Sequence, residues 1–198
     1  MTAKALYIFI LFFVFTAAGT IVHECGHYIP AYLYGWEPAL HYAQTSLSVA
    51  IPASPALNNW KVLSYHAGGM MVNISIGSIG YIILKKQHHL LKNEYLKAFL
   101  IVLTFFWSRQ IVILISDLRE LVYDSPILTD EQKVSLQLSL PKNLLSILLG
   151  VIAIYLCCNA VLRFLPKKEI MPFRVAGIIG SVLGYLFWFR VLGPGILP

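Results

Sequence analysis

The chain has 198 residues and a formal net charge of +6. Apolar and aromatic residues make up 58% of it and charged residues only 12%, about half of the roughly 25% that is usual in a soluble domain. A soluble fold of this length needs more polar surface, so we expect a lipid bilayer to surround most of the chain. The basic residues lie between apolar runs, without the interleaved aromatic side chains of a nucleic-acid surface, and no nucleic-acid partner is expected.

Five apolar runs, each close to the ~20 residues that cross a bilayer, predict an all-α integral membrane fold. We expect helices at about 4–30, 61–84, 97–117, 143–163 and 175–192. The first run begins like a secretory signal peptide, but it continues past Val22, which favours a retained membrane helix. No internal repeat or linker divides the sequence, so residues 1–198 are expected to form one membrane-embedded domain.

The segment between the first two helices has a different pattern. Thr45, Leu47, Val49 and Ile51 alternate with polar or small residues, and this period of two predicts a short β-strand or hairpin. An exposed strand edge can accept an extended peptide. An ordinary hairpin at the membrane interface is the alternative.

The sequence His23-Glu24-Cys25-Gly26-His27 is an HExxH motif near the end of the first apolar run. Residues four apart share one face of a helix, so both imidazoles can reach one metal ion. Glu24 then lies beside the open coordination position, where a general base is needed. Three ionisable residues at the end of a membrane helix are costly, which favours a functional Zn²⁺ site over an interfacial polar cluster.

A catalytic zinc ion usually takes three protein ligands, so one more is expected. Asp117 at the end of the third run is the expected third ligand, and His66 is the alternative ligand or a supporting residue. At 1.5 Å per residue, His23 lies ~28 Å and Asp117 ~30 Å from the lysine that precedes each run, and His66 only ~8 Å from the lysine that starts the second run. All three are therefore expected at one level of the membrane.

Two other features of the apolar runs bear on the site. Gly69, Asn73 and Gly77 recur every four residues in the second run, which predicts a small helix face that another helix approaches closely. Asn73 either joins the two helices or hydrogen-bonds a substrate backbone. Arg109, inside the third run, is expected to pair with a carboxylate or to extend toward the headgroups, and an oxyanion role is a further alternative.

The basic residues also predict an orientation. Five helices place nine of the 15 lysines and arginines on the side of the N-terminus: Lys4, Lys85, Lys86, Lys92, Lys97, Arg163, Lys167, Lys168 and Arg174. The positive-inside rule then places the N-terminus in the cytoplasm and the HExxH motif toward the opposite face.

These motifs, in their order along residues 5 to 126, resemble the site-2 protease family, the M50-type intramembrane zinc metalloproteases. The His23–His27 motif resembles the family's HExxH helix, and Ala67–Asn73 is similar to its AGPxxN-like helix. Ser116-Asp117-Leu118 followed by Pro126 resembles the helix whose aspartate completes the zinc site, as in the M50B-like branch. The sequence departs from the family in lacking the common proline after Gly69 and an NPDG-like sequence around Asp117, and it has no room for a PDZ domain.

The resemblance implies a zinc-dependent peptidase in which His23, His27 and Asp117 hold the metal and Glu24 is the general base. It also implies a membrane protein or peptide as substrate and the bacterial cytoplasmic membrane as location. The family's site usually opens to the cytosol, in conflict with the charge count.

The expected strand has a counterpart in the family, where a strand helps to hold the unwound substrate, so Thr45, Leu47 and Val49 are candidate substrate contacts. Two other functions stay open. One is a metal-binding membrane protein without protease activity, such as a regulator or carrier. The other is a membrane hydrolase of a non-peptide substrate.

Overall fold

The computed structural model describes residues 2–48, 60–87, 89–120, 123 and 128–197. Within these residues, five helical stretches are long and apolar enough to cross a bilayer: Ala3–Leu33, Trp60–Gln87, Glu94–Glu120, Leu144–Phe164 and Lys167–Ile196. They confirm the expected all-α membrane fold and make the chain an integral membrane protein. The fifth helix begins at Lys167, earlier than the expected 175, because its first turn is polar and directly follows Pro166.

The helices and strands follow one another along the chain as α1 (Ala3–Leu33), β1 (Pro38–Leu40), β2 (Thr45–Leu47), α2 (Trp60–Gln87), α3 (Glu94–Thr104), the 3-10 turn η1 (Phe105–Trp107), α4 (Ser108–Glu120), α5 (Asp130–Gln137), α6 (Leu144–Phe164), α7 (Lys167–Phe187), the π-helical turn η2 (Trp188–Leu192) and α8 (Gly193–Ile196). The short helices α5 and α8 lie outside the five expected helices.

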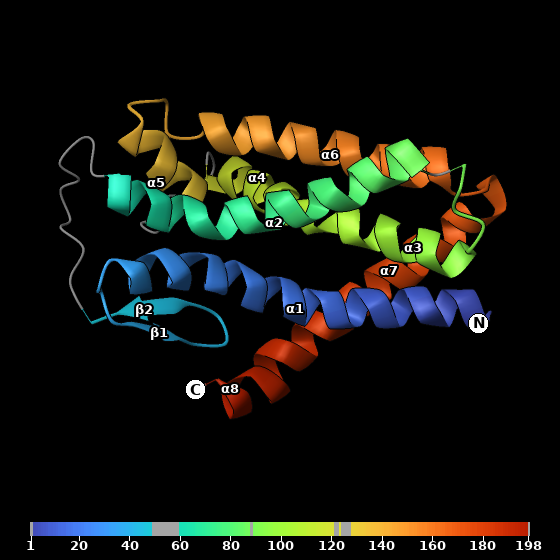
Figure 1. Cartoon of the computed structure of the whole chain (residues 1–198), viewed down its shortest axis with the longest axis horizontal. Helices are drawn as coiled ribbons and strands as arrows, with labels where there is room; N and C mark the ends of the chain where they lie inside the picture. Colours follow the sequence, from blue (N-terminus) through green and yellow to red (C-terminus); the bar gives the residue numbers. More distant parts are fainter. Residues whose placement is uncertain (1, 49–59, 88, 121–122, 124–127, 198) are drawn as a thin grey trace.

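The helices form a bundle around α1 and α2. The α1 helix packs against both α2 and α7, α2 also packs against α3, and α4 packs against α6 (Figure 1). The α7 helix crosses α1 obliquely, whereas α5 lies at the end of the bundle far from the N-terminus, against α2 and α6. The hairpin lies beside the C-terminal half of α1.

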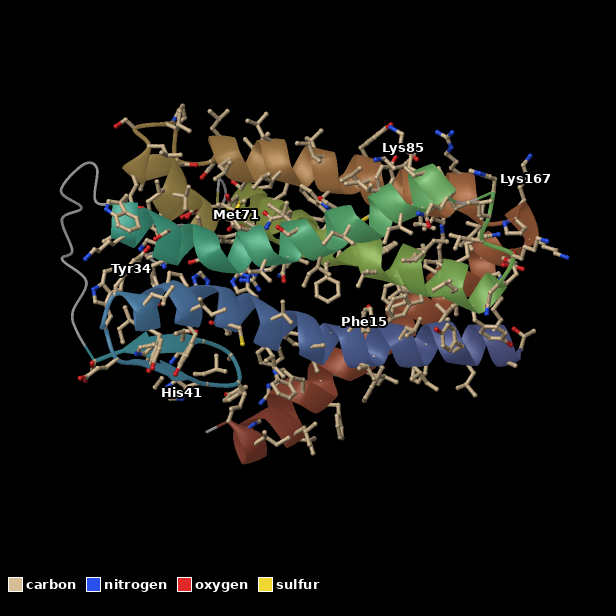
Figure 2. The ribbon with its side chains drawn as sticks, in the orientation of Figure 1. Phe15, Tyr34, His41, Met71, Lys85 and Lys167 are labelled. Carbon is tan, nitrogen blue, oxygen red and sulfur yellow. The ribbon has the colours of Figure 1, made fainter. Side chains whose placement is uncertain are left out.

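The two ends of the bundle differ in chemistry. The largest apolar cluster lies toward the N-terminal end of α1, where Ile8 and Phe12 meet Phe173 of α7. At that end Lys4 also bridges Glu94 of α3 and Glu169 of α7. Figure 2 shows Lys85 and Lys167 at this end and Tyr34 and His41 at the other. The buried polar residues of the HExxH motif therefore lie away from the main apolar core.

The hairpin follows α1 directly. The strands β1 and β2 are antiparallel, with Pro38 opposite Leu47. Gly35 at φ +71° makes the turn that leads into β1, in a region of backbone conformation that glycine adopts without a steric cost. The predicted strand is confirmed for Thr45–Leu47, while Val49 and Ile51 lie outside the described residues.

Candidate metal centre

The α1 helix places the HExxH motif inside the bundle. His23, Glu24 and His27 are only 1%, 6% and 5% exposed. Because His23 and His27 lie one helical turn apart, their Nε2 atoms come within 3.1 Å of each other. The two imidazoles therefore present nitrogen atoms to one point, as the motif predicts.

Glycines of α2 bring that helix against the motif. A Cβ added to Gly68 would lie 2.0 Å from the backbone oxygen of Gly26, and one added to Gly69 would lie 2.4 Å from His27 Nε2. The expected close approach is thus present at Gly69. Gly77, in contrast, faces η1, since a Cβ there would meet the Trp107 ring at 2.5 Å.

The third side chain at this point is Asp130, the first residue of α5. Its Oδ2 lies 3.1 Å from His27 Nε2 and 3.3 Å from His23 Nε2. These three are the group of described His, Cys, Asp and Glu residues whose atoms lie close enough together to hold a metal ion. A capping box starts α5, since Thr129 accepts from the Gln132 backbone and the Gln132 side chain accepts from the Thr129 N–H. The cap therefore fixes the backbone at the start of α5, where Asp130 lies.

The spacing of the three atoms suits a zinc ion. Two ligands of a tetrahedral zinc, bound at ~2.0–2.1 Å, lie about 3.3–3.4 Å apart. The nitrogen and oxygen atoms of His23, His27 and Asp130 are 3.1–3.3 Å apart. Two imidazoles and one carboxylate also match the ligand set of catalytic zinc sites, which keep the fourth position open.

Hydrogen bonds fix the form of both imidazoles. His27 Nδ1 donates to the Tyr65 carbonyl oxygen at 2.6 Å, so in the neutral ring Nε2 carries a lone pair. Arg109 Nη2 donates to His23 Nε2 at 2.8 Å, which makes that nitrogen an acceptor as well. With both rings neutral, two lone pairs and a carboxylate oxygen therefore meet at one point. Arg109 already satisfies the lone pair of His23, and a proton or a cation held between His27 and Asp130 would satisfy the others.

The carboxyl of Asp130 is held in its ionised form. Burial raises its pKa, but contacts with the imidazoles of His23 and His27 and the ammonium of Lys133 outweigh burial, and the pKa lies well below the ordinary value. Lys133 Nζ lies 3.5 Å from Oδ1, on the oxygen that does not face the histidines. The negative charge that a metal ligand needs is thus present at neutral pH.

The structure does not bring Asp117, the expected third ligand, to the histidines. Asp117 is buried and accepts a hydrogen bond from the Ser146 hydroxyl of α6, so it joins α4 to α6. Arg109 is the residue of the third span that reaches His23, and Asp117 lies eight residues, about 12 Å, further along the helix. His66, the alternative ligand, is half-buried on α2 and outside the ligand group.

The hairpin contacts Glu24, the candidate general base. The Thr45 hydroxyl lies 2.9 Å from the backbone oxygen and 3.1 Å from Oε2 of Glu24. Tyr65 donates its hydroxyl to the Thr45 carbonyl at 3.2 Å, so the same tyrosine supports both His27 and the hairpin. Leu47 is half-buried in β2, and Val49 lies outside the described part of the chain.

A cavity of about 490 Å³ opens onto Glu24, and we call it the slot. It lies between α1, the α3–α4 stretch and α7, and extends along α1 from Phe12 to Glu24, a rise of about 18 Å. Asn73 and Arg109 line the end that holds Glu24, and Tyr185 lies on the α7 wall. Asn73 is buried with its Oδ1 unpartnered within the described residues. The slot thus has an apolar length and a polar end.

No protein-family model, curated protein or solved structure matches this chain. Its function is therefore inferred from its own residues. Their arrangement offers a group that could hold a metal ion, a carboxylate next to it and a cavity that opens onto that carboxylate.

Proposed function

We propose that this protein is a zinc-dependent peptidase of the site-2 protease type, which hydrolyses peptide bonds of membrane protein substrates within or beside the bilayer. The proposed location is the cytoplasmic membrane of a bacterium. One observation supports this most: His23 Nε2, His27 Nε2 and Asp130 Oδ2 converge within 3.1–3.3 Å inside a membrane bundle. Asp130 takes the place that the sequence assigned to Asp117.

Zinc at this position would lower the pKa of a water molecule toward ~7 and polarise the scissile carbonyl. The chain itself supplies the proton transfer. Glu24 lies beside the two ligand histidines at the polar end of the slot, so its carboxylate takes the proton of the attacking water and later gives it to the leaving amine. Thr45 holds the Glu24 carboxylate in place through its hydroxyl.

The shape of the slot bears on the substrate. The cavity is elongated and runs about 18 Å along α1, so an extended chain could lie along it with its reacting bond at the polar end. A helical substrate must in any case unwind before hydrolysis, because its carbonyl oxygens are otherwise occupied by helix hydrogen bonds.

The same slot favours one second candidate. An extended acyl chain is apolar along its length and has a polar head, which matches the apolar wall and polar end of the slot. A membrane hydrolase of an acyl lipid is therefore the alternative. The Thr45 contact of the hairpin with Glu24 favours the peptide, because a strand beside the base can align an extended backbone.

The test uses full-length protein purified in detergent and loaded with zinc. Metal analysis should give about one zinc per chain, lost in His23→Ala and in His27→Ala. Glu24→Gln should keep the zinc but abolish cleavage of a co-expressed membrane protein substrate, with Glu37→Gln on the hairpin as the matched control. Release of fatty acid from lipid vesicles without peptide cleavage would select the alternative. A protein that binds no zinc would refute both.

A further inference from the structure

Arg109 is a charged residue inside the third membrane span. Its charge acts on the carboxyl of Glu131 in α5, but the two form no ion pair. It is half-buried at the polar end of the slot, and its Nη2 donates to His23 Nε2 at 2.8 Å. Its Nε is buried with no acceptor among the described residues. None of the ion pairs formed by those residues includes it. Because a charge at membrane depth is costly, such an arginine calls for a functional explanation.

The contact with His23 is incompatible with a metal ion at the site. An imidazole nitrogen has one lone pair. His23 Nε2 uses it to accept from Arg109, and a zinc ion would need the same lone pair. Metal binding therefore releases the Arg109 N–H. The guanidinium cannot lose its charge, so it would then stand beside a divalent cation of which the Asp130 carboxylate balances only one charge.

An anionic oxygen between the two cations would satisfy both. Hydrolysis of a peptide bond produces one, because the carbonyl oxygen becomes negative when water attacks the carbonyl carbon. Glu24 and Arg109 both line the polar end of the slot, so a carbonyl placed there has the base and the guanidinium within reach.

We propose that Arg109 is a catalytic residue of this hydrolase: its guanidinium donates to the scissile carbonyl oxygen and stabilises the negative charge that develops there. This inference rests on the proposed peptidase function. A planar guanidinium has several N–H donors in a fixed arrangement, which suits an oxygen whose charge rises during the reaction.

Hydrolysis by these residues proceeds in two stages. Glu24 takes a proton from water while the water oxygen forms a bond to the carbonyl carbon. The π electron pair of the carbonyl moves to its oxygen, which Arg109 then holds. The C=O bond then re-forms and the C–N bond breaks. The amine nitrogen keeps the electron pair of the broken C–N bond and takes the proton from Glu24. The products are a carboxylic acid and an amine, and no other reactant is consumed.

Two alternatives to this role make different predictions. Arg109 could serve only to orient the His23 imidazole, in which case its removal should weaken zinc binding. Asn73, buried at the same end of the slot, could be the donor to the carbonyl oxygen instead. In that case Asn73→Ala, and not a change at Arg109, should lower kcat.

The first measurement is zinc affinity, by competition with a chromophoric chelator in detergent. Arg109→Gln should bind zinc as tightly as the wild type or several-fold more tightly, because a competing cation has been removed. Arg119→Gln, on the same helix and without a contact to the histidines in the described structure, is the matched control. Zinc affinity tenfold weaker in Arg109→Gln than in this control would overturn the proposal and assign Arg109 the orienting role.

The second measurement separates binding of the substrate from stabilisation of its charge. Arg109→Gln should lower kcat by roughly 10²–10³-fold, with KM within about twofold, and Arg109→Lys should recover part of the loss. A peptide with a phosphonamidate in place of the scissile amide should bind Arg109→Gln more weakly by a similar factor. An unmodified peptide should bind the Glu24→Gln single variant and the Glu24→Gln/Arg109→Gln double variant equally well.

The outcomes also separate this inference from the proposed function. A wild type that binds zinc and cleaves, together with an Arg109→Gln variant of unchanged kcat, refutes the role of Arg109 and leaves the peptidase intact. A wild type that neither binds zinc nor hydrolyses the substrate refutes both. Equal losses of affinity for the phosphonamidate and for the unmodified peptide would show that Arg109 only binds substrate.

Discussion

Gly69 of α2 lies directly against His27 of α1, so closely that a Cβ at Gly69 would be 2.4 Å from His27 Nε2 and 2.5 Å from His23 Cε1. No side chain fits between these atoms without moving an imidazole. We predict that Gly69→Ala displaces the histidines and lowers zinc affinity by at least tenfold, at a cost of about 1–3 kcal/mol in stability from overpacking. Chelator competition and thermal unfolding in detergent measure the two effects.

Gly195→Ala is the control for this variant, because a Cβ at Gly195 has no atom within 4 Å. It should leave zinc binding and unfolding unchanged. Wild-type zinc affinity in Gly69→Ala would show that the imidazoles do not keep this position when metal is bound.

The two aspartates provide a direct test of the ligand set. Asp130→Asn should lose most of the bound zinc, because a neutral amide oxygen replaces a charged ligand between two imidazoles. Asp117→Asn should keep about one zinc per chain, since Asn can still accept the Ser146 hydrogen bond and Asp117 does not contact the histidines. The number of zinc ions per chain is measured on both purified variants. Zinc lost in Asp117→Asn and kept in Asp130→Asn would show that Asp117 is the ligand.

The membrane spans could be predicted from sequence because their lipid-facing surfaces must be apolar over a fixed length. The expected 61–84 and 143–163 agree with α2 and α6 within a few residues. The α1 helix continues beyond Pro30 to Leu33, since Pro30 removes only its own N–H donor and its carbonyl still accepts from Tyr34.

The third member of the proposed ligand group could not be predicted in the same way. The depth argument assigned Asp117 a level along the membrane, but it could not show that Asp117 faces Ser146 of α6. Asp130 lies in a polar stretch outside the apolar runs. Hydropathy does not show where such a stretch contacts the bundle. One local signal was available: Thr129 and Gln132 form a capping box, which predicts a helix that starts with Asp130.

The link between Thr45 and Glu24 predicts a catalytic effect without a loss of metal. Thr45→Val keeps the shape of the side chain but removes the hydroxyl that lies 3.1 Å from Glu24 Oε2. A hydrogen bond to a charged group contributes about 1.5–3 kcal/mol, so kcat should fall by roughly 10–100-fold. Zinc content should stay the same and Thr45→Ser should restore activity. Full activity in Thr45→Val would show that the hairpin does not support Glu24 in catalysis.

Zinc binding should depend on pH through the imidazoles and not through Asp130. The pKa of Asp130 is lowered below its ordinary value of 3.8, so its carboxylate is ionised at every pH above that value. The imidazoles must lose their protons to bind zinc, and their ordinary pKa is about 6.5. Affinity measured from pH 8 to 5 should therefore fall as the pH is lowered, with up to two protons taken up for each zinc released. An affinity that stays constant from pH 8 to 5 would contradict this assignment.

The distribution of charge predicts which face of the membrane the metal centre meets. Lys85 and Lys167 lie at the N-terminal end of the bundle, and His41 lies at the opposite end with the hairpin (Figure 2). Because lysines and arginines concentrate on the cytoplasmic side of a membrane protein, we expect the N-terminus inside the cell and the metal centre near the outer face. The family resemblance implies the opposite orientation, so the measurement discriminates between the two.

Single cysteines, placed in a chain whose Cys25, Cys157 and Cys158 are replaced by alanine, can report this orientation. Leu140→Cys lies in the exposed turn after α5, at the end that holds the metal centre, and Lys92→Cys lies in the exposed loop before α3, at the lysine-rich end. A membrane-impermeant thiol reagent added to intact cells should label Leu140→Cys and spare Lys92→Cys, and both should react after the cells are opened. Labelling of Lys92→Cys alone would place the centre on the cytoplasmic side, and a substrate would then have to present its scissile bond there.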